Sequence, residues 1–269
     1  MDVVFDIGAN KGWETEDATM CDYHTRRPWV DNYRVVCVEP VPALCETLKE
    51  KFAKNDVTVV QAAVTDEEPE SGEIDLWISE HDTMSTCSRE RIDERHKFMT
   101  GHYYDNGKTE VASTPVTRID KLVEEHGRPV FIKIDVEGYE HRVLNTFSER
   151  YCPISFEWGE QEKDNTLKSL LRCKELGYTK FWITFGNLGI CSGHKDLIDK
   201  MCECEYWVGE LRWMYQCINL VSAALSYDEA VTWMNNNCQH NRVLIIGESK
   251  TTGRVLRRTD PLWGQIYAE

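Results

Sequence analysis

The sequence has no long hydrophobic run and no excess of positive charge. No apolar run among its 269 residues approaches about 18 residues, the length that a membrane-spanning helix needs, and no charged-then-apolar signal peptide opens the chain. Lys and Arg number 31 against 46 Asp and Glu, a net charge of −15. Because nucleic-acid-binding proteins carry a basic footprint, this balance argues against a nucleic acid as partner. The acidic residues are spread along the chain, which is typical of a solvated surface.

The chain also lacks the paired cysteine spacing of a zinc site. Its eleven cysteines are an odd number, and Cys37, Cys152 and Cys173 fall in patterns typical of buried strands or helices. This favours reduced thiols over a disulfide framework, so we expect a cytoplasmic protein. Cys202 and Cys204 form a close pair, but no second pair follows at zinc spacing, and we predict no zinc there.

Two common phosphate-binding loops are missing from a segment that otherwise predicts a ligand site. Residues 1–5 are an apolar run, and D-I-G-A-N-K-G follows at 6–12 before a helix-compatible segment. This order predicts a strand, a tight turn and a helix start, the place where an open α/β sheet binds its cofactor. The loop has neither G-x-G-x-x-G nor G-x-x-x-x-G-K-[ST], which argues against a dinucleotide or a triphosphate. An acidic strand end before a glycine loop suits a cationic cofactor that carries an amino acid, such as S-adenosylmethionine. A tight turn without a ligand is the alternative for this loop taken alone.

Further strand and helix patterns alternate along the chain. The run 35–38 ends at Glu39, and an acid at the end of the second strand of such a site accepts hydrogen bonds from ribose hydroxyls. Pro42 opens an amphipathic helix over 42–54. We therefore predict an α/β protein, with further strands at 57–64, 74–78, 110–116, 130–134, 154–156, 178–185 and 242–247, and further helices at 118–126, 137–147 and 166–176.

Four motifs, in order along residues 1–158, resemble the FkbM-type S-adenosylmethionine-dependent methyltransferases. They are the loop D-I-G-A-N-K-G, V-E-P-V-P-A at 38–43, Q-A-A-V at 61–64 and F-I-K-I-D-V-E-G-Y-E at 131–140. I-D-V-E-G-Y-E is specific for that family, whereas many methyltransferases share the glycine loop. The resemblance implies a Rossmann-like seven-stranded class I methyltransferase sheet, S-adenosyl-L-methionine as cofactor, and O-methylation of a hydroxyl. The acceptor in that family is commonly a sugar or glycan, or a polyketide-type metabolite. Family members also occur fused to glycosyltransferases, so the chain could be a domain of a larger protein.

The resemblance and the strand ends together give the candidate site residues. For cofactor binding they are Asp6, Gly8, Ala9, Asn10, Gly12, Glu39, Pro40, Ala63 and Asp135. For proton transfer they are Asp135 at the end of the fourth strand, Glu137 in the first turn of the next helix, and His141 one helical turn later on the same face. Helix capping is the alternative role for the two acids.

A metal-dependent reaction is a second possibility at the same place. Asp135, Glu137 and Glu157 could gather oxygen ligands for Mg²⁺, which lowers the pKa of a bound hydroxyl. Because Asp135 and Glu137 are only two residues apart and serve the cofactor equally well, we do not favour Mg²⁺.

Two segments are expected to shape the acceptor site of a single domain over 1–269. Residues 79–109 are polar, and 186–241 form a helical insertion near the C-terminus that is rich in aromatic residues; the core takes 1–185 and 242–250. A surface insertion and ordinary core aromatics are the alternatives. The acceptor-binding candidates are Glu157, Trp158 and His81. A nicotinamide oxidoreductase and a non-catalytic cofactor-binding module are the rival functions, and the missing third glycine counts against the first.

Overall fold

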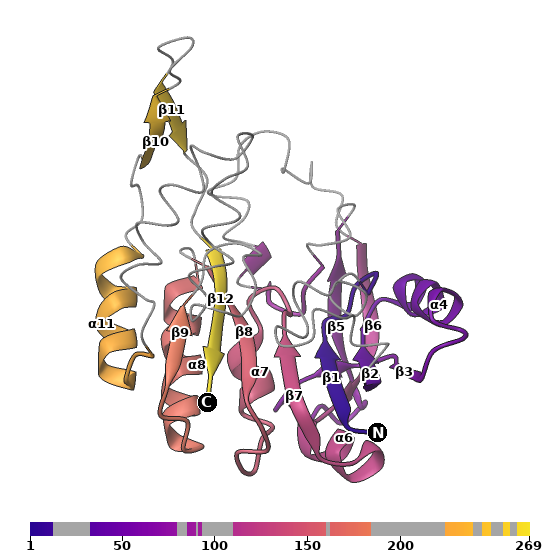
Figure 1. Ribbon diagram of the computed structural model, residues 1–269. Coiled ribbons are helices and arrows are strands. Elements are labelled where there is room, and N and C mark those ends of the chain that lie inside the picture. The colour runs from indigo at the N-terminus through magenta and orange to yellow at the C-terminus, as the bar shows by residue number, and fades with distance from the viewer. Residues whose placement is uncertain are drawn as a thin grey trace.

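A seven-stranded sheet forms the centre of the molecule (Figure 1). The computed structural model describes residues 1–12, 33–79, 85–89, 91–92, 110–159, 162–183, 224–238, 244–248, 255–258 and 263–269. The strand order is β3 (Val57–Val60), β2 (Arg34–Val38), β1 (Val3–Ile7), β7 (Pro129–Ile134), β8 (Ile154–Gly159), β12 (Trp263–Ala268) and β9 (Phe181–Ile183). The first five strands run parallel, and β12 runs antiparallel to both of its neighbours. The predicted Rossmann-like seven-stranded α/β sheet is therefore confirmed.

Both faces of the sheet are covered, which explains the nearly unbroken apolar runs of its central strands. On one face lie α6 (Ile119–His126), α7 (Glu140–Leu144), α8 (Lys163–Glu175) and α11 (Tyr227–Asn237), which share one hydrophobic core with Phe5 and Phe156. On the other face α4 (Pro42–Lys51) packs Leu48 against Val4 and Cys37. Alternate residues of β1 and β2 thus point into two different cores.

A smaller sheet stands beside the main one and corrects one predicted strand. β5 (Glu73–Ile78) pairs antiparallel with β6 (Glu110–Thr117), and β6 pairs parallel with β4 (Ala63–Val64). The expected strand over 57–64 therefore breaks after Val60, because the chain leaves the main sheet and joins this second sheet. Within the described residues, no helix is both long and apolar enough to cross a membrane.

The segment predicted as the seventh strand, 242–247, is extended where it is described but does not join the main sheet. Residues 244–247 belong to β10 (Leu244–Glu248), which forms a separate two-stranded hairpin with β11 (Val255–Arg258) (Figure 1). The seventh strand is β12, in which Ile266 aligns with Phe156 on one side and Ile183 on the other. A β-branched run indicates that a segment is extended, but the choice of neighbours depends on residues far away in sequence.

Candidate functional site

The glycine loop after β1 is pressed against the ends of β2 and β7. The amide of Gly8 donates a 2.9 Å hydrogen bond to the carbonyl oxygen of Val38. A Cβ on Gly8 would lie 1.8 Å from the carbonyl oxygen of Asp135, and φ at Gly8 is +79°. Asn10 and Gly12 also have left-handed backbone, with φ of 50° and 72°. The close approach to Asp135 and the left-handed φ together require glycine at position 8.

Glu39 is the buried acid that holds this loop in place. The residue is 4% exposed, and its carboxylate accepts hydrogen bonds from the amide of Asn10 at 2.8 Å and that of Val41 at 2.9 Å. Burial raises the pKa of Glu39 to about 7, although both amides and Lys133 oppose the rise. Each carboxylate oxygen has two acceptor positions, so acceptor capacity remains for ribose hydroxyls. The residues at the ends of β1 and β2 thus fit an adenosine-containing cofactor.

A buried lysine lies between the acids at the ends of β1 and β7. The ammonium nitrogen of Lys133 is 3.5 Å from Asp6 Oδ1 and 3.5 Å from Asp135 Oδ2. It also donates a 3.4 Å hydrogen bond to the carbonyl oxygen of Gly8. Asp6 and Lys133 are register partners on neighbouring strands, so their side chains share one face of the sheet.

The segment after β7 is a tight loop, which corrects the predicted helix over 137–147. Glu137 and Gly138 have φ of 58° and 91°, and α7 begins only at Glu140. Glu140 is buried, and its Oε1 accepts hydrogen bonds from the amides of Val136 and Gly138. Burial raises the pKa of Glu140 to about 7. Because Glu137 precedes the helix, it does not share a helical face with His141.

Arg91 connects the polar segment after β5 to this loop. It forms ion pairs with Glu137 at 2.5 Å and with Glu162 just before α8. A Cβ on Gly138 would approach Arg91 Cδ to 2.8 Å, so the glycine lets the arginine pass close to the backbone. Thr86 adds a 2.8 Å hydrogen bond from its hydroxyl to the carbonyl oxygen of Glu137. Thr86 and Arg91, both within the predicted acceptor segment 79–109, therefore lie against the tight loop between β7 and α7.

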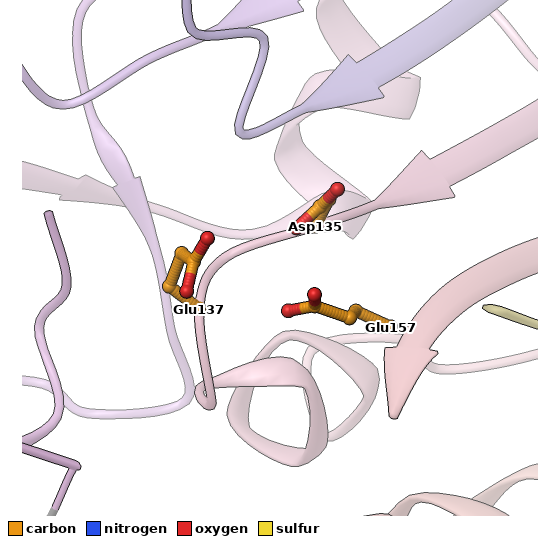
Figure 2. A group of neighbouring side chains, drawn as sticks. All are labelled: Asp135, Glu137 and Glu157. Atoms are coloured by element: carbon orange, nitrogen blue, oxygen red, sulfur yellow. The ribbon is translucent and has the colours of Figure 1, made fainter. Parts of the chain in front are cut away.

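Three acids face one another beside this loop (Figure 2). Asp135, Glu137 and Glu157 each offer a carboxylate oxygen, and these atoms lie within 4.8 Å of one another. Glu157 reaches toward the loop from β8, where it is the register partner of buried Gln265 on β12. Burial, and next the charges of Asp135 and Glu137, raise the pKa of Glu157 well above its usual value. A carboxylate whose pKa is raised is a stronger base than a free one, and the trio can also ligate a hard cation.

The remaining candidates are placed less centrally. His141 lies half-buried on α7, outside the cluster that Asp135, Glu137 and Glu157 form. Trp158 is 1% exposed and packs edge-on against Trp233 of α11, with ring centroids 5.5 Å apart. Trp158 points to the opposite face of the sheet from Glu157, so we remove it from the acceptor site. Trp233 packs against the hydrophobic core, which was the alternative role for the aromatic residues of 186–241. Ala9 and Ala63 are buried, and the carbonyl oxygen of Pro40 accepts a hydrogen bond from Thr114.

Several predicted features lie outside the described residues. They are His81, Cys202, Cys204 and most of 79–109 and 186–241. Sequence reasoning also missed Lys133, Arg91 and Gln265. A lysine inside the apolar strand F-I-K-I was a signal for the first of these, whereas nothing local marked the other two.

Comparison with known proteins agrees with the four sequence motifs. A family model described as the methyltransferase FkbM domain matches residues 6–208. Among solved structures, the chain is similar to precorrin-6y C5,15-methyltransferase from Geobacter metallireducens GS-15, with a TM-score of 0.39 and 9% sequence identity. That alignment covers 99% of this chain and 78% of the other. No curated protein matches the sequence.

Proposed function

Since this chain belongs to the FkbM methyltransferase family, we propose that it transfers a methyl group from S-adenosyl-L-methionine to a hydroxyl of a sugar or glycan. Membership of the family implies use of S-adenosylmethionine; the oxygen as target and the sugar as acceptor are our proposal. A polyketide or another small hydroxylated metabolite is the alternative acceptor. We place the reaction in the cytoplasm, because the buried cysteines Cys37, Cys152 and Cys173 are free thiols.

The ends of β1 and β2 would hold the cofactor. The backbone of Gly8 and Asn10 would contact it closely, and Glu39 would accept hydrogen bonds from its ribose. When bound, the cofactor supplies an electrophilic methyl group on a positively charged sulfonium. The carboxylates of Asp6, Glu39 and Asp135 surround this edge of the sheet and favour a cationic ligand.

The observation that carries the proposal is the cluster of Asp135, Glu137 and Glu157, whose carboxylate oxygens lie within 4.8 Å of one another; the raised pKa of Glu157 agrees with it. When the acceptor hydroxyl takes the methyl group that the bound cofactor supplies, the carboxylate of Glu157 would accept the hydroxyl proton. Glu137 is less suited to this role, because Arg91 already pairs with it. Asp135 would orient the hydroxyl, and positioning and exclusion of water would contribute most of the acceleration.

Three features support a neutral acceptor with several hydroxyls. Carboxylates only accept hydrogen bonds when ionised, and hydroxyl groups are suitable donors to them. The net charge of −15 disfavours a polyanion. Gln265, buried beside Glu157, adds an amide that is able both to donate and to accept.

Incubation with methyl-labelled cofactor and a pool of candidate glycans, followed by mass spectrometry, tests the acceptor. Label on a sugar oxygen is the expected result; label on nitrogen or carbon contradicts O-methylation, and no turnover with any pool favours a non-catalytic module.

The proton acceptor is tested separately by Glu157→Gln. This change should lower kcat by roughly 10²–10⁴-fold and keep the affinity for S-adenosylhomocysteine. Wild-type kcat should rise with pH as Glu157 loses its proton, and the variant should lack that rise. Exposed Glu149, which pairs with Arg128, gives the matched control Glu149→Gln. Equal kcat in both variants would place the base elsewhere, with Asp135→Asn and His141→Ala the next to measure.

A further inference from the structure

Lys133 is a charged residue in a position where the strand pattern calls for an apolar one. It lies on β7 between Ile132 and Ile134, both fully buried, and its side chain is only 5% exposed. A buried ammonium is costly unless partners compensate its charge. Its partners are Asp6 and Asp135, each 3.5 Å away, so the lysine joins the carboxyl ends of two neighbouring strands.

The same ammonium reaches the loop that would carry the cofactor. It hydrogen-bonds the carbonyl oxygen of Gly8, and its charge opposes the rise in the pKa of Glu39 at the end of β2. The charge of Lys133 therefore affects the acids at the ends of all three strands, β1, β2 and β7. It partly cancels the negative potential that Asp6, Glu39 and Asp135 create there.

We propose that Lys133 is a positioning residue that sets how strongly the site prefers the charged methyl donor over the neutral product. This inference rests on the proposed cofactor. S-adenosylmethionine and S-adenosylhomocysteine differ by one methyl group and one unit of positive charge. Asp6 and Asp135 attract that charge, and Lys133 limits the attraction. Donor and product then bind with comparable strength, and the donor is not held so tightly that binding lowers its reactivity.

The test compares the dissociation constants of both ligands by calorimetry. In Lys133→Met the ratio of the product's Kd to the donor's Kd should rise on the order of tenfold, because one positive charge leaves a partly buried site. In Asp6→Asn the ratio should fall by a similar factor, because the site loses one negative charge that attracts the donor and compensates Lys133. Opposite shifts are the signature of charge, since a purely structural role would weaken both ligands alike.

Lys51→Met is the matched control. The ammonium of Lys51 donates a 2.8 Å hydrogen bond to the carbonyl oxygen of Lys11 in the same loop, but Lys51 is exposed. Its loss should leave the ratio unchanged, because solvent screens that charge.

The possible outcomes are separable. If Lys133→Met does not fold, Asp6→Asn decides, and an unchanged ratio there overturns the inference. A ratio that is unchanged in both variants, or shifts equally in Lys51→Met, also overturns it and leaves the proposed function standing. A wild-type protein that binds neither ligand contradicts the cofactor assignment and the inference together.

Discussion

Replacing Gly8 by alanine should destabilise the protein through a collision that no rotamer relieves. The new Cβ would meet the carbonyl oxygen of Asp135 at 1.8 Å and its carbonyl carbon at 2.8 Å, so the backbone itself must move. The left-handed φ of +79° adds about 1–2 kcal/mol for any residue with a Cβ. Overpacking of this kind costs about 1–3 kcal/mol more. We expect a total loss of about 2–5 kcal/mol.

Gly72→Ala supplies the control, because it isolates the backbone conformation. Gly72 has φ of +72°, but a Cβ there would meet nothing within 4 Å. Its cost should be only about 1–2 kcal/mol. Since 1 kcal/mol shifts the melting temperature of a domain this large by roughly 2–4 °C, Gly8→Ala should lower it by roughly 4–20 °C and Gly72→Ala by roughly 2–8 °C.

Thermal and urea unfolding of the two variants measure this difference, and calorimetry adds a second readout. Binding of S-adenosylhomocysteine should weaken in Gly8→Ala and stay unchanged in Gly72→Ala, because only the first lies in the cofactor loop. Equal losses of stability in the two variants would refute the close approach of this loop to the end of β7.

Two further predictions concern charge. Burial raises the pKa of Glu39 from 4.5 to about 7, so the folded protein binds a proton that the unfolded chain releases, and stability falls as pH rises through that window. At 1.36 kcal/mol per pKa unit, Glu39→Gln should remove up to roughly 3 kcal/mol of this fall in stability. Urea unfolding at pH 4.5 and 8 measures the free energy of unfolding of both proteins. The same change in that free energy between the two pH values in variant and wild type would contradict the prediction. Thorough treatment with EDTA should leave turnover unchanged, because Arg91 already compensates the charge of Glu137. Activity that disappears with EDTA and returns with Mg²⁺ would instead assign Asp135, Glu137 and Glu157 to a metal ion.

The sequence predicted the parts of the site that depend on strand ends. Asp6, Glu39 and Asp135 follow apolar runs, and parallel strands bring their carboxyl ends to one edge, so their proximity could be inferred without coordinates. The positive φ of Glu137 could not, because glutamate ordinarily avoids that conformation and the pattern continues smoothly into the helix.

Contacts between distant segments account for the other misses. Arg91 pairs with Glu137 and Glu162 because the segment after β5 packs against the loop after β7. Residues this far apart in sequence leave no local pattern from which the contact could be predicted. Gln265 comes to lie beside Glu157 through antiparallel pairing of β12, whereas the more strongly β-branched run at 242–247 looked like the better strand. Propensity measures how readily a segment extends, and burial between two particular neighbours outweighs it.

The insertion of β12 between β8 and β9 has a consequence for synthesis on the ribosome. β8 and β9 leave the ribosome long before residues 263–268, yet β9 joins the main sheet through β12, and its other described pairing is a single bridge between Phe181 and Leu225. Until that strand arrives, one side of β8 and the side of β9 that faces β12 present unpaired backbone groups, which other nascent chains could pair with. Late closure of a non-local strand pair is slow and prone to aggregation. Expression at low temperature or with added chaperones should therefore improve the yield of folded protein more than changes at the surface.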